Sequence, residues 1–180
     1  MKVQITRDMT TIIDTLWTDS NKEYITNGYF LIKNSLSKIT SKKVEIVTNS
    51  NIDNSLNNLL NFTFKELIVE LDINSFKEKE PNKRSVYTPI KRCFTTITTP
   101  NGEFDYFINS VYIKPLKQFT KMGGKLKLGI SIPSKKDYLK LSDCVKPINQ
   151  TLKLELNNQI VGTLAPVTHN RDEAEYTFTK

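Results

Sequence analysis

Three acidic residues alternate along one short apolar stretch, and two lysines follow them. Glu66, Glu70 and Asp72 lie in FKELIVELDI, and Lys77 and Lys79 come shortly after. Residues two or four positions apart share one face of a strand, so the carboxylates could converge on a hard divalent cation, as in metal-dependent nucleases. However, the lysines fall in a segment without periodicity, and the Glu-x-Lys pair of such sites is missing. We therefore favour alternating charge on a solvent-facing strand and keep a nuclease as the less favoured alternative.

Other nucleophiles and metal ligands are sparse. His169 is the only histidine, and Cys93 and Cys144 are the only cysteines. They leave little material for a zinc site or for a Ser-His-Asp or Cys-His triad. No Walker A loop, Gly-x-Gly-x-x-Gly or His-Glu-x-x-His motif is present, and the glycines of MGGKLK follow a predicted helix, whereas a phosphate-binding loop precedes one. The sequence thus predicts that the protein is not an enzyme and uses no metal or cofactor.

Basic residues form the clearest pattern that could bind a ligand. Lys114, Lys117 and Lys121 are spaced i, i+3 and i+7, so they share one helix face, and Lys125 extends the basic surface beyond two glycines. Arg7 is the basic residue of a first predicted helix. The chain has 26 Lys and Arg against 19 Asp and Glu, a formal charge of +7. Such a row of ammonium groups can neutralise DNA phosphates without sequence preference; the alternative is an ordinary solvated helix face.

Two helices are predicted to position these basic residues. The lysine helix spans about 111–122, with Pro115 in its first turn and Gly123 just past its end. Its buried face would consist of Ile113, Leu116 and Phe119. The first helix is predicted within TRDMTTIIDTLWT, residues 6–18, with Thr6 as its N-cap, because five apolar residues recur there at helical spacing: Met9, Ile12, Ile13, Leu16 and Trp17.

Strand patterns fill most of the remaining chain. We predict β-hairpins that turn at Asn27-Gly28 and at Asn157-Asn158, because these residues tolerate positive φ. Leu152, Leu154 and Leu156 would face inward in the second hairpin, with Lys153 and Glu155 outward. Further strands are expected at 1–5, 42–48, 64–73, 93–99, 125–131 and 138–142, and a short helix at 51–62.

The composition changes between Asn74 and Arg92, where the chain is charged, contains two prolines and lacks periodicity. We predict an irregular segment there and divide the chain into two domains, 1–80 and 93–180, with a linker at 81–92. Each half has a similar order of elements. The predicted fold class is α+β, with two small, similar domains of antiparallel sheet and helices on one face. No apolar run is long enough to span a bilayer and no signal peptide is visible, so we expect a cytoplasmic protein.

Two stretches resemble the bacterial DNA polymerase III β sliding clamp family. In TNGYFLI, the residues Thr26, Gly28, Tyr29, Phe30 and Leu31 are similar to a Thr-Asp-Gly-His-Arg-Leu stretch of that family; in TLAPV, the residues Leu164, Pro166 and Val167 are similar to its C-terminal strand. Asn27 stands where the family has aspartate, and Tyr29-Phe30 where it has His-Arg. The resemblance implies that these residues line one hydrophobic pocket for polymerase or clamp-loader peptides.

The resemblance also implies a function. The protein would be a processivity factor that encircles double-stranded DNA, with basic helices facing the channel and a DNA polymerase tethered through the pocket. The chain is about half the length of a cellular β clamp, so a ring requires a homo-oligomer, with a trimer favoured and a dimer possible, and a phage origin would fit a compact version. The open alternative for the function is a nucleic-acid-binding or phage inhibitory accessory protein that forms no ring. The alternative for TLAPV is an ordinary edge strand, which its proline protects from aggregation.

Overall fold

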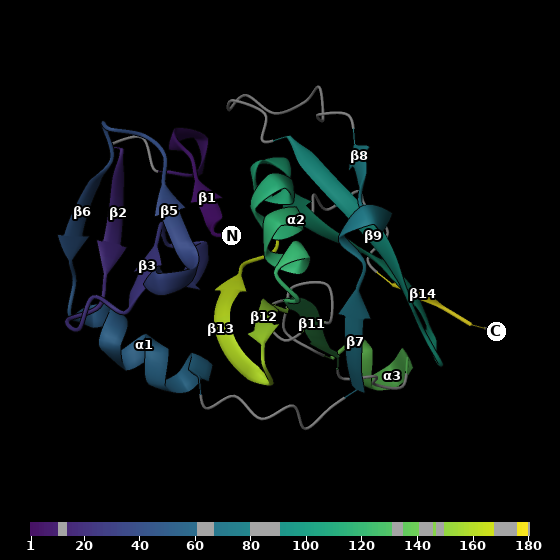
Figure 1. Cartoon of the computed structure of the whole chain (residues 1–180). Helices are drawn as coiled ribbons and strands as arrows, with labels where there is room; N and C mark the ends of the chain where they lie inside the picture. Colours follow the sequence, from purple (N-terminus) through teal and green to yellow (C-terminus); the bar gives the residue numbers. More distant parts are fainter. Residues whose placement is uncertain are drawn as a thin grey trace, which may run out of the picture.

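The structure is a computed structural model that describes residues 1–10, 14–60, 67–79, 91–130, 135–140, 146, 150–167 and 176–179. Strands predominate over helices in a mixed α+β fold (Figure 1), which confirms the predicted fold class at that level. Within the described ranges, no helix has the length and apolar character needed to cross a membrane.

The central layer is an eight-stranded sheet in the order β6-β2-β3-β4-β13-β12-β11-β7. Its members are β2 (Thr15–Thr18), β3 (Tyr24–Thr26), β4 (Phe30–Lys33), β6 (Glu45–Thr48), β7 (Leu67–Leu71), β11 (Lys125–Ile130), β12 (Leu152–Leu156) and β13 (Gln159–Leu164). The β2–β6 pair is parallel, and the other neighbours are antiparallel. Because β4 pairs with β13, segments far apart in the sequence join in one continuous sheet.

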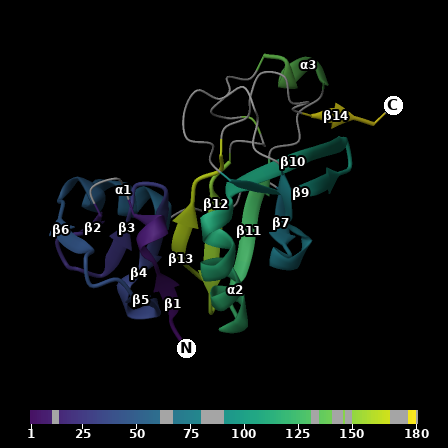
Figure 2. The ribbon, with the colours of Figure 1, turned by 90° about the horizontal axis from the view of Figure 1, so that it is seen from above.

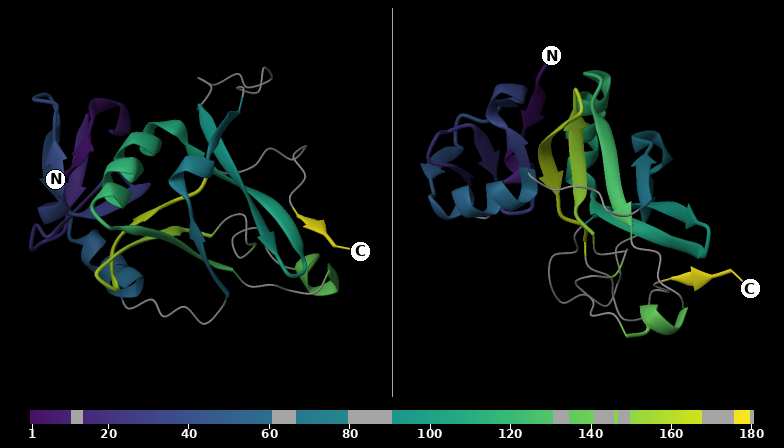
Figure 3. Two further views of the ribbon diagram at one scale, coloured as in Figure 1. Left: turned by 45° about the vertical axis from the view of Figure 1, so that its right-hand side comes forward. Right: turned by 90° about the horizontal axis from the view of Figure 1, so that it is seen from below.

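Two smaller sheets and the helices pack around this layer. A four-stranded antiparallel sheet contains β8 (Lys77–Lys79), β9 (Arg92–Thr99), β10 (Gly102–Asn109) and β14 (Thr177–Phe178), and its β9–β10 hairpin is the long teal hairpin of Figure 3. A parallel pair joins β1 (Val3–Ile5) to β5 (Ser37–Ile39). The α-helices are α1 (Asn51–Leu60), α2 (Ile113–Lys121) and α3 (Lys135–Tyr138), and the 3-10 helices are η1 (Arg7–Met9), η2 (Asn34–Leu36), η3 (Ile73–Ser75) and η4 (Ser110–Tyr112).

The two longer helices pack on opposite faces of the central sheet. Phe30 and Ile32 of β4 belong to the main core, which also contains Leu116 of α2. Leu31, between them, points the other way and packs with Leu56 of α1 in a second cluster. Successive side chains of a strand alternate between faces, so the prediction that the helices lie on one face is wrong.

The predicted β-hairpins are confirmed, and so are the helices at 51–60 and 113–121. Asn157 and Asn158 adopt φ values of 52° and 62°, and Gly28 adopts 93°, as these turns require. Lys153 and Glu155, predicted to face outward, are buried at 6% and 9% exposure. Their side chains do point away from the leucines, toward the opposite face of the sheet. That face is also largely shielded from solvent at β12, which is an interior strand.

Three predictions about local structure are wrong. The first predicted helix is instead η1 followed by strand β2, in which Thr15 and Trp17 pair in parallel with β6; Ile12 and Ile13 lie outside the described residues. In the segment from Asn74 to Lys79, predicted to be irregular, Asn74 and Ser75 belong to η3 and Lys77 to Lys79 form β8. Tyr138, predicted to lie in a strand, ends α3. In the first and second cases, pairing with a distant strand overrides the local pattern.

Strands from both predicted domains contribute to the central sheet, and their grouping differs from their order in the sequence. β7 pairs with β11, and β8 pairs with β9, so the last two strands of the predicted first domain lie beside strands of the second. Residues 81–90 of the predicted linker lie outside the described residues, and Arg92 already begins β9. The division into two similar domains stays a prediction.

Candidate functional site

The helix that carries the predicted DNA-binding lysines is well defined at both ends. Asn109 Oδ1 accepts a hydrogen bond from Val111 N at 3.1 Å, at the start of η4, which leads directly into α2. At the other end, Gly123 N donates to Thr120 O and Gly124 N donates to Phe119 O, at 3.0 and 3.1 Å. This pair of bonds is a Schellman motif, which needs the positive φ of Gly123, 85°. The lysines therefore lie on a helix with fixed ends.

Lys114, Lys117 and Lys121 form an exposed row on α2, which we call the α2 lysine row. The opposite face of the helix, including Leu116 and Phe119, is buried in the main core at 0% and 1% exposure. Among the described residues, none of the three ammonium groups forms an ion pair or hydrogen bond. The helical rise of 1.5 Å per residue separates the ends of the row by about 10 Å. The row is thus a rigid line of positive charge that no acidic residue compensates within the described part of the chain.

The other two predicted DNA contacts differ from this row, Lys125 by its position and Arg7 by its ion pair. Lys125 alternates along β11 with Leu126, which is buried in the core under α2, so its side chain leaves the opposite face of the sheet. There its Nζ lies 3.6 Å from Glu70 Oε2. The expected continuation of the basic surface past Gly124 is therefore wrong for Lys125, because a residue of the strand next to a buried one must face the other way.

Arg7 lies near the beginning of α2, because η1 contacts η4. Its guanidinium holds Asp14 with two contacts of 2.9 Å, from Nε to Oδ1 and from Nη2 to Oδ2. This hydrogen bonding raises the pKa of Arg7 and lowers the pKa of Asp14. The charge of Arg7 is locally compensated, so it contributes less to attraction of an anion than the α2 lysines do.

The two stretches that carry the clamp resemblance lie side by side. Leu164 of β13 is opposite Phe30 of β4 in the antiparallel register, and Thr163 is opposite Leu31. The contact continues beyond the strands, because Ala165 N donates a hydrogen bond to Tyr29 O at 2.8 Å. The structure thus brings together two segments separated by about 130 residues of sequence.

The apolar side chains of these stretches do not form one open pocket. Phe30, Leu31 and Leu164 are buried at 4%, 7% and 0% exposure, and Leu31 faces α1 whereas the other two face the main core. Tyr29 is 66% exposed and Gly28 is exposed, while Thr26, Pro166 and Val167 are half-buried. The three buried residues therefore stabilise the sheet, and any peptide would meet only the others. The peptide-binding role stays a prediction.

Asn27 has a structural role that the sequence did not reveal. Its side chain is buried at 6% exposure, and Oδ1 accepts hydrogen bonds from Tyr29 N at 2.9 Å and Phe30 N at 2.7 Å. Its Nδ2 donates to Met9 O and, at 2.7 Å, to Tyr112 Oη. Asn27 thereby connects the β3–β4 turn to η1 and η4. Asparagine in a turn predicts a positive φ, and only burial identifies this residue as a cross-link.

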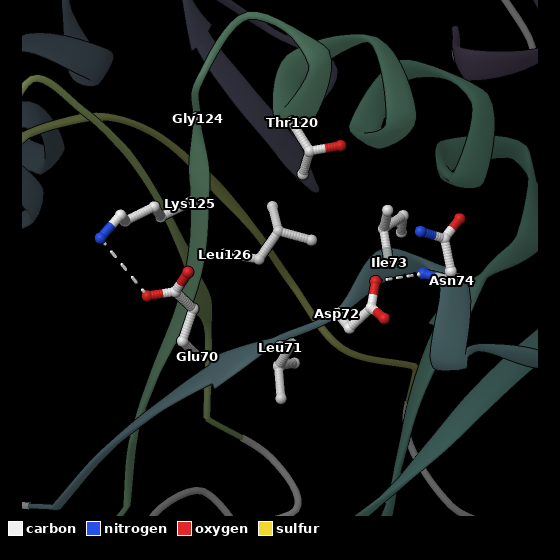
Figure 4. A pocket seen from close by; sticks show the side chains of 9 residues that line it. All are labelled: Glu70, Leu71, Asp72, Ile73, Asn74, Thr120, Gly124, Lys125 and Leu126. Atoms are coloured by element: carbon white, nitrogen blue, oxygen red, sulfur yellow. Dashed lines mark hydrogen bonds and ion pairs between the residues drawn. The ribbon is translucent and has the colours of Figure 1, made fainter.

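Residues of the alternative nuclease site line a pocket of about 460 Å³ between β7, η3 and the start of β11 (Figure 4). Within it, Glu70 points toward Lys125, and Asp72 Oδ1 accepts a hydrogen bond from Asn74 N at 2.8 Å, so the two carboxylates are engaged separately. Glu66 lies outside the described residues. In the part of the chain that the structure describes, no three His, Cys, Asp or Glu residues gather as a metal site.

The predicted lysines of that site also lie elsewhere. Lys77 and Lys79 are in β8 of the four-stranded sheet, and Lys79 Nζ lies 5.0 Å from the ring centroid of Phe107. Cys93 is a buried free thiol whose pKa is raised by burial, which disfavours the reactive thiolate. Cys144 and His169 lie outside the described residues.

No protein-family model matches the chain, and comparisons with curated proteins and with solved structures also find no match. The resemblance to β sliding clamps therefore depends only on the residues quoted above and stays a prediction.

Proposed function

We propose that the protein is a non-catalytic DNA-binding accessory protein of the processivity-factor type, which holds duplex DNA through the α2 lysine row. The observation that carries this proposal is the combination of a chain charge of +7 with three exposed ammonium groups on one rigid helix, which have no partner among the described residues. Contacts of this kind bind phosphates without reading base sequence and leave a protein able to slide.

The open edges of the central sheet support an assembly of several copies. Among the described strands, β6 and β7 each lie at an end of the sheet order. Ile46 and Val47 on β6 are 47% and 40% exposed, and Leu67 and Ile68 on β7 are 42% and 43% exposed. Exposed apolar edge strands favour pairing with another chain. Joining β6 of one copy to β7 of the next would bury both pairs.

Charge favours one direction for this contact. Lys42 and Lys43 precede β6, whereas Glu70 and Asp72 lie at the end of β7. Antiparallel pairing would place the beginning of β6 near the end of β7, so the lysines would approach the carboxylates. Such a head-to-tail contact closes into a ring when its rotation fits, and a trimeric or dimeric ring around DNA is the form we propose. A DNA polymerase or clamp-loader peptide as partner rests on the sequence resemblance alone.

The DNA-binding proposal is tested by neutralising the row with Lys114→Gln, Lys117→Gln and Lys121→Gln. A matched control neutralises three exposed lysines at and after α3: Lys135, Lys136 and Lys140. Binding to a short duplex is measured by fluorescence anisotropy at several salt concentrations. We expect the row variant to lower the slope of log K against log salt by about 3, at about 0.9 per phosphate contact, and the control to leave it unchanged. Equal effects of both variants would mean that only net charge matters, which contradicts the proposal.

The assembly is tested with Ile46→Lys and Ile68→Lys, each of which places a charge on one edge. Leu139→Lys is the control, because Leu139 is 74% exposed and lies near α3 rather than on either edge. Light scattering should give an oligomer for the wild type and the control and a monomer for each edge variant. An equimolar mixture of the two edge variants retains one intact β6 and one intact β7, so it should form dimers and nothing larger. A monomeric wild type at high concentration, or a mixture that stays monomeric, would contradict head-to-tail assembly.

A further inference from the structure

A second basic region lies in a pocket of about 490 Å³ at the edge of the structure near the N-terminus. Three lysines line it, from three separate segments: Lys2 before β1, Lys22 in the turn between β2 and β3, and Lys33 at the end of β4. Of the described residues that line it, Glu23 is the only acidic one, and Ser35 lines it as well. The lining therefore has a formal charge of +2 and a polar group that can donate a hydrogen bond.

The backbone that carries Lys22 is fixed from two sides. Ser20 donates hydrogen bonds to Asp53 of α1, from N at 3.0 Å and from Oγ at 2.5 Å. On the other side, Asn34 N donates to Glu23 O at 2.6 Å, and Asn34 Nδ2 donates to Lys22 O at 3.1 Å. Lys22 itself has a φ of 58°, which is uncommon for a residue with a side chain. The turn thus holds Lys22 beside Lys33 in a defined position.

Lys2 connects this pocket to the α2 lysine row. Val3 pairs with Ser37 of β5, next to η2, and Gln4 N donates to Gln118 Oε1 of α2 at 2.7 Å. η1, which follows β1, contacts η4, which precedes α2, so β1 and α2 run in opposite directions side by side (Figures 1 and 2). Lys2 therefore lies toward the same end of this pair as Lys121. Lys2, which lines the pocket, is thus placed near the end of the α2 lysine row.

Charge compensation of the three pocket lysines can be judged from the residues that the structure describes. Among the described residues, Lys2, Lys22 and Lys33 form no ion pair, although Glu23 lines the same pocket. Several uncompensated ammonium groups held around one concavity attract a multiply charged anion, and a phosphate offers oxygens for both ammonium groups and a hydroxyl donor. A second line of phosphates beyond α2 would meet this pocket if DNA follows the basic surface.

We propose that the pocket of Lys2, Lys22 and Lys33 binds phosphate groups of DNA, as a second contact on the path that begins at the α2 lysine row. This inference rests on the proposed DNA-binding function. It predicts that further counterions are released from DNA when its phosphates contact the pocket lysines. It also identifies the N-terminal strand as part of the DNA-binding surface.

The test compares Lys22→Gln/Lys33→Gln with Lys135→Gln/Lys136→Gln, which removes the same charge near α3. Urea unfolding midpoints establish that both variants are folded. In the salt titration of DNA binding, the pocket variant should lower the slope of log K against log salt by about 2, and the control should not lower it. In a second measurement, pyrophosphate is added during ¹H–¹⁵N spectroscopy. It should shift the amide signals of Lys22, Glu23 and Asn34 in the wild type, and the shifts should be lost in the pocket variant.

The outcomes separate this inference from the proposed function. If the α2 variant lowers the slope but the pocket variant behaves as wild type, the inference is wrong and the DNA-binding proposal remains. If neither variant changes DNA binding, both are wrong. If pyrophosphate shifts the pocket amides while DNA binding is unaffected by the pocket variant, the pocket takes a free phosphorylated ligand, and its assignment to DNA is overturned.

Discussion

Replacing Asn27 by aspartate tests whether the buried amide is essential as a donor. Aspartate would keep the two hydrogen bonds that Asn27 Oδ1 accepts from the backbone, but its second oxygen would face Met9 O, which now accepts from Nδ2. Tyr112 can rotate its hydroxyl hydrogen and donate to the new carboxylate. Met9 O is a carbonyl oxygen, which has no hydrogen to donate. Leaving that buried acceptor without a donor costs about 1–3 kcal/mol, and burying the carboxylate adds to this. We expect Asn27→Asp to lower the free energy of unfolding by about 2–4 kcal/mol at pH 7.

The pH dependence of the stability of this variant is a second, independent test of the role of the Asn27 amide. Burial beside a carbonyl should raise the pKa of the new carboxyl in the folded state, so between the unfolded and folded pKa values the folded state binds more protons. Stability then decreases as pH rises through that window, and the penalty relative to wild type should disappear below about pH 4, the ordinary aspartate pKa. A protonated carboxyl can also donate to Met9 O.

Asn109→Asp is the matched control for this measurement. Asn109 Oδ1 accepts from Val111 N at the start of η4, the residue is only half-buried, and a carboxylate preserves that cap. Urea unfolding at pH 7 and pH 4 compares the two variants. If Asn27→Asp is as stable as Asn109→Asp at pH 7, the amide is not the donor that the structure describes, and the argument for Asn27 as a cross-link is wrong.

Two further predictions concern the core. Gly162→Ala should lower the free energy of unfolding by about 1–3 kcal/mol in urea titration, because the added Cβ would lie 2.4 Å from Leu31 O where β4 pairs with β13; wild-type stability would contradict that close pairing. Burial strongly raises the pKa of Tyr106, whose hydroxyl donates to Gln150 O at 2.8 Å. The unfolded state therefore loses this proton first, and stability should fall as pH rises above about 10. Part of the absorbance change at 295 nm should then appear only on alkaline unfolding and be absent in Tyr106→Phe; the same alkaline profile in both proteins would be contrary evidence.

Local chemistry was enough to predict elements whose structure depends on a few neighbouring residues. The turns at Gly28 and at Asn157-Asn158 contain residues that accept the positive φ observed there, and α2 needs only its apolar spacing and Gly123. The exposure of Lys114 and Lys117 followed from the same helical period. For these features, the sequence pattern and the final environment agree.

The failures occur where a distant partner decides the structure. The residues from Met9 to Trp17 fit a helical period, yet Thr15 to Thr18 form a strand because β6, about thirty residues later, pairs with them in parallel. Thr15, Trp17 and Thr18 also favour strand. Likewise, the sequence predicted that Lys125 continues the basic surface of the lysine helix, but it did not indicate the sheet face on which Lys125 lies, which is the face opposite α2. Periodicity indicates a local preference for helix or strand. It does not indicate which face of that element another part of the chain will cover.

The β4–β13 pairing determines how the two edges of the central sheet are placed for the proposed assembly. It joins the strands of the N-terminal region to those of the C-terminal region in a single sheet, and the same sheet ends at β6 on one side and β7 on the other. Because Phe30 and Leu164 are used in holding this junction, the residues that resemble a peptide pocket serve first to hold the sheet continuous. A continuous sheet fixes the direction of β6 relative to β7, and that direction decides whether successive copies close into a ring. Disrupting the junction with Gly162→Ala should therefore weaken assembly as well as folding, whereas Ile46→Lys should weaken assembly alone; identical unfolding and assembly defects in both variants would contradict this separation.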